Sequence, residues 1–169
     1  GTAVMLDVKS ATGNFFYSTG VSEHLDSKID IAAMDALIRA LSDDSGVYLI
    51  ARLPALRDRM YGLNNVNDGV FDTRGAYLYR DDGGCYWLNP GSEGTLSYLT
   101  QIITELKDLG FDEVLLYDFC FPETTNILVR GGSQAELLTN AANVLLAACA
   151  TERFAVSFEK TEEFTMPEG

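Results

Sequence analysis

Charged side chains stand near the carboxyl ends of the segments that the sequence predicts as strands. Asp7 and Lys9 close the first segment, Arg52 the second, Asp118 the third and Glu159 the fourth. Carboxylates and cations held together can move protons or bind polar ligands, and parallel α/β folds bind ligands at this edge of the sheet. Salt bridges between strand ends, such as Lys9 to Asp7 or Arg52 to Asp118, are the structural alternative.

An alternation of strands and helices is needed to bring these residues together. Short β-branched and apolar runs predict strands at 4–9, 46–53, 113–119 and 153–160, and apolar residues at helical spacing predict helices at 27–41, 92–109 and 133–148. Ser92 and Ser133 are predicted N-caps, and Gly110 is predicted to end the second helix. The pattern is typical of βαβ units and predicts one α/β domain over residues 1–169, with parallel strands.

The long segment 57–90 lacks helical periodicity and is rich in Gly, Asp and Asn. Within it, "GAYLYRDDGGCYWLNP" predicts a hairpin around the "DDGG" turn, inserted after the second strand. Loops at this position often contact substrates. The alternative is an ordinary hairpin that buries its own aromatic residues, Tyr77, Tyr79, Tyr86 and Trp87.

Composition argues against several classes of partner. The net charge of −13 repels phosphate backbones, so we expect no nucleic acid, and it also disfavours anionic membranes. Three cysteines without a CxxC pair and a single histidine, His24, predict no metal site or cofactor. The chain lacks an apolar stretch of about 18 residues that would span a membrane. No signal peptide is visible, and "GTAVMLDVKS" reads almost at once as a strand, so we expect a fragment of a longer protein.

Four motifs in one order resemble a known family. "LDVKSATG", "GVYLIARLPALRD", "YWLNP" and "ELKDLGFDEVLLYDFCFP" are similar to the IDVKD, IARI…KD, WxNP and GFDEIQFDYVRFP motifs of a glycoside hydrolase-like family of (β/α) barrels. The resemblance covers roughly residues 4–122. It implies a TIM-type barrel that acts on polysaccharide through acidic residues at the strand ends, and it suggests an exported or cell-envelope location. The matched positions are Asp7, Lys9, Arg52, Asp58, Trp87, Asn89 and Pro90.

The resemblance also implies roles for individual residues. Asp118 and Glu159 would be the catalytic pair, one a general acid and the other a base or nucleophile. Residues expected to contact a carbohydrate substrate are Asp7, Lys9, Arg52, Trp87, Asn89 and Tyr117.

Two positions depart from the family pattern. Aligned without a gap, Tyr117 stands where the last motif has aspartate, and Cys120 stands where it has arginine. Asp118 comes one residue later and would face the opposite side of a regular strand, unless a local bulge redirects it. A carbohydrate-binding or structural module without catalysis is therefore the alternative function.

Four predicted strands amount to half a barrel, since a complete one takes about 250 residues. We therefore expect a partial or reduced TIM-like barrel, whose exposed sheet edges could pair in a homodimer or be covered by another segment or protein.

Overall fold

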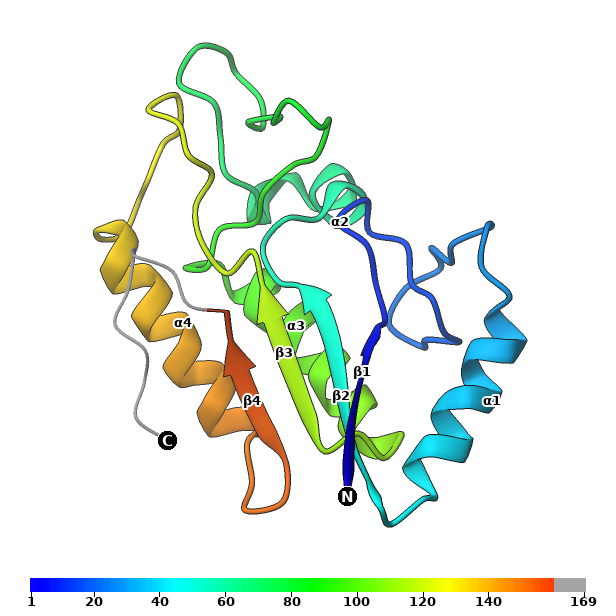
Figure 1. Ribbon diagram of the computed structural model, residues 1–169. Coiled ribbons are helices and arrows are strands. Elements are labelled where there is room, and N and C mark those ends of the chain that lie inside the picture. Colours follow the sequence, from blue (N-terminus) through cyan, green and yellow to red (C-terminus); the bar gives the residue numbers. More distant parts are fainter. Residues whose placement is uncertain (160–169) are drawn as a thin grey trace.

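Four parallel strands form the centre of the computed structural model, which describes residues 1–159 (Figure 1). They lie side by side in chain order, β1-β2-β3-β4. The elements are β1 (Thr2–Asp7), α1 (Ile31–Ser42), β2 (Val47–Pro54), α2 (Arg59–Asn64), a 3-10 turn η1 (Val66–Asp68), α3 (Glu93–Asp108), β3 (Glu113–Tyr117), α4 (Gln134–Cys149) and β4 (Ala155–Phe158). The predicted α/β order of strands and long helices is confirmed, whereas the short helices α2 and η1 lie in the segment 57–90, where no helix was predicted.

Local capping chemistry fixes several helix ends. Helix α1 begins four residues later than predicted, because the Asp30 side chain accepts a hydrogen bond from the Ala33 N–H at 3.0 Å and caps it there. The Ser133 hydroxyl caps α4 in the same way, through the Glu136 N–H. Ser92 precedes α3 as predicted, but its hydroxyl donates to the Asp68 carboxylate and makes no capping bond. Gly110 follows α3 with a φ of 99°, which favours glycine.

The two faces of the sheet have different surroundings. One face is buried: α1 packs against β2, α3 against β3 and α4 against β4, while α3 and α4 also contact each other. Its strand residues include Leu49, Ala51, Leu53, Val114, Leu116, Val156 and Phe158. On the other face Met5 is 50% exposed and Tyr48 43% exposed. Figure 1 views this face, with β1 and β4 at the two edges of the sheet and no helix of the described residues in front.

The connections after β1, β2 and β3 gather at the carboxyl edge of the sheet (Figure 1). The predicted hairpin is present there: Arg80 and Tyr86 form an antiparallel bridge, and the Asp81 N–H donates to the Cys85 carbonyl at 2.9 Å. In this hairpin Trp87 is only 8% exposed, whereas Tyr77 is 43% exposed. The hairpin therefore buries part of its aromatic surface and presents the rest to solvent.

Candidate functional site

An exposed ion pair lies at the ends of β1 and β2. Asp7 and Arg52 are partners in the strand register, and their side chains meet at 3.1 Å between Oδ1 and Nη1. The Arg52 guanidinium also lies over the Tyr117 ring, 4.0 Å from its centroid. Arg52 is thus held between a carboxylate and an aromatic ring, on the face of the sheet that the helices leave open. The structural alternative of a salt bridge from Arg52 to Asp118 is wrong, because the carboxylate that Arg52 contacts is that of Asp7.

Asp118 follows β3 directly and breaks the strand geometry. Its φ of 50° places it in the left-handed region, which aspartate enters more readily than most residues. Its carbonyl still accepts the Leu56 N–H at 3.3 Å. Burial raises the pKa of the Asp118 carboxyl, the Arg57 cation opposes this, and the negative charge of Glu159 adds to it. The carboxyl therefore lies within electrostatic reach of both Arg57 and Glu159.

Glu159 stands at the end of the neighbouring strand. Its N–H donates to the Leu116 carbonyl at 2.8 Å, which extends the pairing of β4 with β3 by one residue. Its side chain is exposed. One step beyond the last paired residues, Leu116 and Phe158, Glu159 stands beside Tyr117, and Asp118 is the next residue after Tyr117. The negative charge of Glu159 acts on the Asp118 carboxyl, and their use as a catalytic pair stays a prediction.

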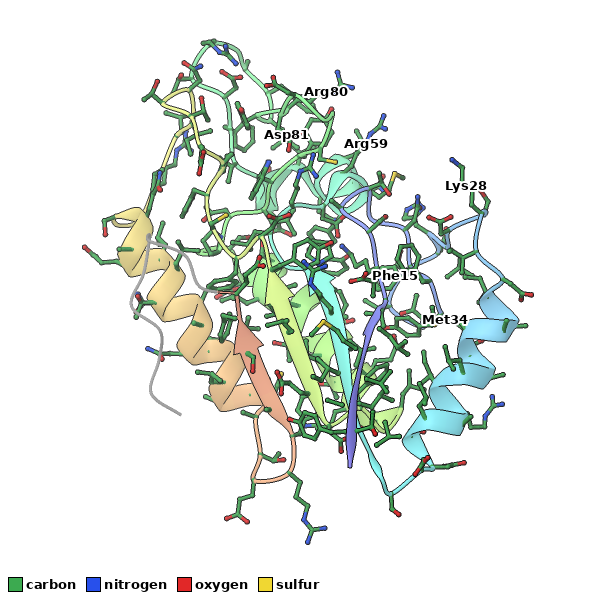
Figure 2. The ribbon with its side chains drawn as sticks, viewed as in Figure 1. Phe15, Lys28, Met34, Arg59, Arg80 and Asp81 are labelled. Atoms are coloured by element: carbon green, nitrogen blue, oxygen red, sulfur yellow. The ribbon has the colours of Figure 1, made fainter. Side chains whose placement is uncertain are left out.

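Arg57 and Asp81 form a second charged group beside this pair. The Arg57 Nε donates to Asp81 Oδ2 at 2.7 Å and its Nη2 to Oδ1 at 3.2 Å. The Trp87 indole N–H and the Cys85 backbone N–H also donate to Asp81, at 2.8 Å and 3.0 Å. Burial acts to raise the pKa of Asp81, but these bonds outweigh it and hold the pKa at about 2. Figure 2 labels Asp81 in the loops beyond the strand ends.

Lys9 lies away from the open edge, inside the protein. Its ammonium contacts Asp58 Oδ2 at 2.8 Å, and the two side chains are only 1% and 0% exposed. The Tyr98 hydroxyl donates to the same oxygen at 2.6 Å, and the Tyr61 N–H donates to Asp58 Oδ1 at 2.9 Å. The structural alternative of a salt bridge from Lys9 to Asp7 is wrong, because Lys9 is buried against Asp58 while Asp7 meets Arg52 at the open edge.

Two other residues predicted to contact substrate are engaged within the protein. Trp87 is buried with its N–H bound to Asp81, and the Asn89 side chain accepts the Gly91 N–H at 2.8 Å. The structure therefore gathers Asp7, Arg52, Tyr117, Asp118 and Glu159 at the edge and separates Lys9, Trp87 and Asn89 from them by burial or local bonding.

Sequence reasoning missed Arg57 and Asp81. Arg57 precedes the matched Asp58, and Asp81 lies in the predicted hairpin turn. The predicted hairpin indicated that Asp81 could approach the strand ends. The pairing of Asp81 with Arg57, however, depends on how the loops fold over the sheet.

Within residues 1–159 the structure has no helix that is both long and apolar enough to cross a lipid bilayer. The same residues contain no group of three or more His, Cys, Asp or Glu side chains placed to hold a metal ion.

The fold and the edge define an α/β protein of the partial TIM-barrel class, with three carboxylates and an arginine–tyrosine stack at the carboxyl ends of its strands. Residues 2–154 match the family described as "Putative glycosyl hydrolase domain", and the chain belongs to that family. The predicted family membership is therefore confirmed. A comparison with curated proteins gave no match.

Several solved structures share the fold. A hypothetical protein from Ruminiclostridium thermocellum ATCC 27405 matches with a TM-score of 0.79 and 20% identity, over 93% of this chain and 82% of that chain. The α-galactosidase of Thermus thermophilus, in complex with p-nitrophenyl α-D-galactopyranoside, matches with a TM-score of 0.62 and 15% identity, over 92% of this chain and 31% of the enzyme. A GH31 dextranase of Flavobacterium johnsoniae, complexed with glucose, matches with a TM-score of 0.55 and 12% identity, over 92% of this chain and 22% of the enzyme.

At these identities the similarity concerns the fold alone. The chain covers less than a third of either glycosidase. The predicted fold class, with alternating β/α units and parallel strands in a partial TIM-like barrel, is confirmed.

Proposed function

We propose that this domain hydrolyses a polysaccharide at the carboxyl edge of its sheet, with Asp118 as the general acid and Glu159 as the second carboxylate. The observation that carries the proposal is the half-buried Asp118, held in a left-handed conformation within electrostatic reach of Glu159 at the end of the next strand. Glycosidases cleave between two carboxyl groups, one of which must hold a proton. The family of the chain supports a carbohydrate as the substrate.

The environment of Asp118 suits the acid role. Burial raises the pKa of its carboxyl, with Arg57 opposing and Glu159 reinforcing the shift. A raised pKa keeps a larger fraction of the acid protonated at neutral pH, which general acid catalysis requires. Glu159, which is exposed, would act as base or nucleophile. Arg52 and Asp7 would bind sugar hydroxyl groups beside the Tyr117 ring.

The named relatives suggest the first substrates to try. One is an α-galactosidase in complex with p-nitrophenyl α-D-galactopyranoside, and another is a dextranase. Release of nitrophenol from that glycoside and of reducing ends from dextran would measure turnover. Asp118→Asn and Glu159→Gln should each lower the rate by about 100-fold or more, as expected for loss of an acid or base.

Glu113→Gln is the matched control, because Glu113 lies at the opposite end of β3 and its carboxylate accepts the Tyr48 hydroxyl at 2.8 Å. That variant should keep the wild-type rate. Equal turnover by Asp118→Asn and the control would contradict the catalytic proposal.

The second candidate is a carbohydrate-binding module without catalysis. It is supported by Tyr117, which stands at the motif's aspartate position and lies beneath the Arg52 guanidinium. Sugar binding without product formation, with an affinity that Asp118→Asn leaves unchanged and Arg52→Gln weakens, would favour this function over hydrolysis.

We further propose that two copies pair through their exposed sheet edges. Among the described residues, β1 and β4 are edge strands, and Met5 on β1 is 50% exposed. Light scattering should then give a dimer for the wild-type chain and a monomer for Met5→Glu. A monomeric wild-type chain would contradict this proposal.

A further inference from the structure

We propose that a cavity on the helix side of the molecule binds a neutral sugar unit, independently of the strand-end carboxylates. The cavity lies between the 13–24 segment, α2 and α3 and has a volume of about 490 Å³, within the range typical of small-molecule sites. Its lining includes none of Asp7, Arg52, Tyr117, Asp118 or Glu159. The inference goes beyond the proposed hydrolysis and does not depend on it.

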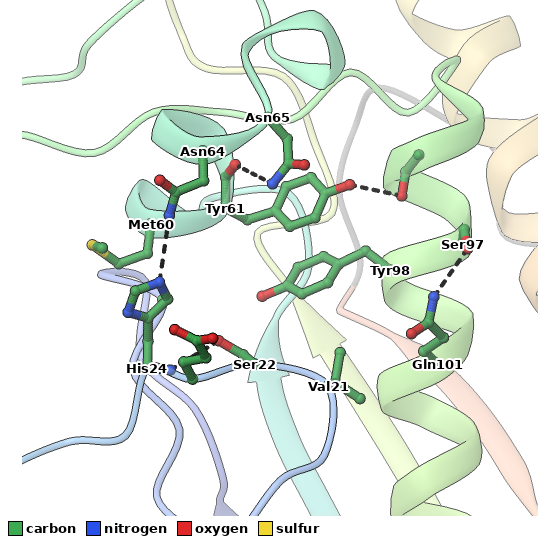
Figure 3. Close-up of a pocket in the computed structure, with 13 residues that line it drawn as sticks. Val21, Ser22, His24, Met60, Tyr61, Asn64, Asn65, Ser97, Tyr98 and Gln101 are labelled. Atoms are coloured by element: carbon green, nitrogen blue, oxygen red, sulfur yellow. Dashed lines mark hydrogen bonds between the residues drawn. The ribbon is translucent and has the colours of Figure 1, made fainter.

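Two tyrosines give the cavity an aromatic wall (Figure 3). The rings of Tyr61 and Tyr98 stack with centroids 4.0 Å apart and planes 22° apart. Their hydroxyls are occupied within the protein: Tyr98 donates to Asp58 at 2.6 Å, and Tyr61 donates to Asp68 at 2.7 Å. The rings are therefore fixed in place. Because Tyr98 is only 7% exposed, the apolar ring surface offered to a ligand comes mainly from the partly exposed Tyr61. The C–H face of a sugar ring packs well against such a surface.

Amide side chains provide polar groups around these rings. Asn64, Asn65 and Gln101 line the cavity and are exposed. Their NH₂ groups have partners: Asn64 Nδ2 lies 3.4 Å from His24 Nε2, Asn65 Nδ2 donates to the Tyr61 carbonyl at 3.0 Å, and Gln101 Nε2 donates to the Ser97 hydroxyl at 3.1 Å. The three amide oxygens remain as acceptors for ligand hydroxyl groups.

The charge of the residues that line the cavity disfavours anionic ligands. Among the described residues that line the cavity, Glu23 alone carries a formal charge at neutral pH, and there is no lysine or arginine. Phosphate, sulfate and carboxylate ligands would therefore meet no cation and one carboxylate. A neutral ligand with many hydroxyl groups matches this combination of amides, hydroxyls and aromatic rings better than an anion or a lipid.

Hydrogen bonds hold the segment 17–20 rigidly against α3, which limits the conformational entropy that the cavity loses when a ligand binds. Glu105 accepts hydrogen bonds from the Tyr17 hydroxyl at 2.6 Å, the Thr19 hydroxyl at 2.6 Å and the Gly20 N–H at 2.7 Å. These bonds tie the segment that leads into Val21 and Ser22 to the helix that carries Tyr98 and Gln101.

The test is an NMR titration of the ¹⁵N-labelled chain with three neutral probes: methyl α-D-galactopyranoside, methyl β-D-glucopyranoside and methyl α-D-mannopyranoside. At least one should shift the side-chain NH₂ resonances of Asn64, Asn65 and Gln101 at millimolar concentration, whereas inorganic phosphate should not. The Asp118→Asn variant should show the same shifts, which separates this cavity from the strand-end site.

Gln101→Ala and Asn64→Ala should each weaken the binding about fivefold, the effect of losing one hydrogen bond. Asn143→Ala is the matched control, because Asn143 is an exposed amide on α4 outside the cavity, and it should leave the affinity unchanged. Absence of shifts at the three amides with every sugar, or shifts that disappear in Asp118→Asn, would overturn the proposal.

Discussion

Two ion pairs, one formed by Asp7 and the other by Lys9 two residues later in the chain, have opposite surroundings. Asp7 and Arg52 meet at the open edge with side chains 60% and 31% exposed, whereas Lys9 and Asp58 meet inside the protein at 1% and 0%. The N–O distances are similar, 3.1 Å and 2.8 Å. Solvent screens the first pair, so its charges remain available to a ligand. The second has lost its hydration and depends on its internal partners.

This contrast separates charges that hold the fold together from charges that stay open to solvent at the same end of the sheet. Asp58 receives Lys9, the Tyr98 hydroxyl and the Tyr61 N–H, and in doing so joins the first loop, α2 and α3. Asp118 and Glu159 lie near the edge and make fewer internal bonds. A charge that the fold does not need for its own stability is a better candidate for contact with substrate.

The largest expected effect is that of Asp58→Ala. It removes the acceptor of Lys9, Tyr98 and Tyr61 and leaves an unpaired buried ammonium, so the free energy of unfolding should fall by about 3–5 kcal/mol. Urea denaturation followed by circular dichroism measures the loss. Adding Lys9→Met to this variant should recover part of it, because the buried charge is then removed. A loss below about 1 kcal/mol would show that the buried pair behaves like an exposed one.

Asp81→Asn should have an intermediate effect, a loss of about 1–3 kcal/mol, because it weakens a charge-assisted group that includes Arg57 and Trp87. The pKa of Asp81 is lowered to about 2. The ionised carboxylate therefore contributes its full stability at pH values above 3.8, the ordinary pKa of aspartate. This contribution is lost as the pH falls through about 2, the pKa in the folded state.

The difference in unfolding free energy between wild type and Asp81→Asn should accordingly narrow from pH 4 towards pH 2, about the window given by the two pKa values. Asp82→Asn, a change at the exposed neighbouring residue, serves as the control. A difference that stays constant over this range would show that ionisation of Asp81 does not stabilise the fold.

Asp118→Asn should have a smaller effect of opposite sign. Because the folded state raises the pKa of Asp118, ionisation of this carboxyl costs stability as the pH rises above 3.8. The variant should be more stable than wild type at neutral pH, by less than about 1 kcal/mol, since a half-exposed carboxylate keeps much of its hydration. Asparagine also tolerates the left-handed conformation. Thermal unfolding at pH 7 and pH 3 would show the gain at the higher pH alone; destabilisation at pH 7 would mean that Arg57 holds the ionised form.

Asp7→Asn should have the smallest effect, below about 0.5 kcal/mol, because its carboxylate is mostly in water. Arg52→Gln should cost somewhat more, about 0.5–1 kcal/mol, since it also removes the contact with the Tyr117 ring. Chemical denaturation at low and high salt compares the two, and the Asp7 effect should decrease in high salt. If Asp7→Asn proved as costly as Asp58→Ala, the contrast between the two pairs would fail.

Several features could be read directly from the sequence because they depend on neighbouring residues. The apolar run that starts at Arg153 predicted the last strand, and the structure confirms it as β4 (Ala155–Phe158). The "DDGG" turn and the glycine after α3 were also predicted correctly. Strand ends at Asp7 and Tyr117 were less predictable, since an apolar run does not show where the pairing with a neighbouring strand stops.

The sequence by itself therefore determined the order of the strands and long helices and indicated the candidate carboxylates, since periodicity and capping are local. Tertiary structure decided that Lys9 pairs with Asp58, that Arg57 pairs with Asp81 and that Asp118 leaves the strand geometry. These outcomes depend on burial and on side chains distant in the chain. Charge pairs of the same chemical type become structural or available to ligand according to how much water the fold leaves around them.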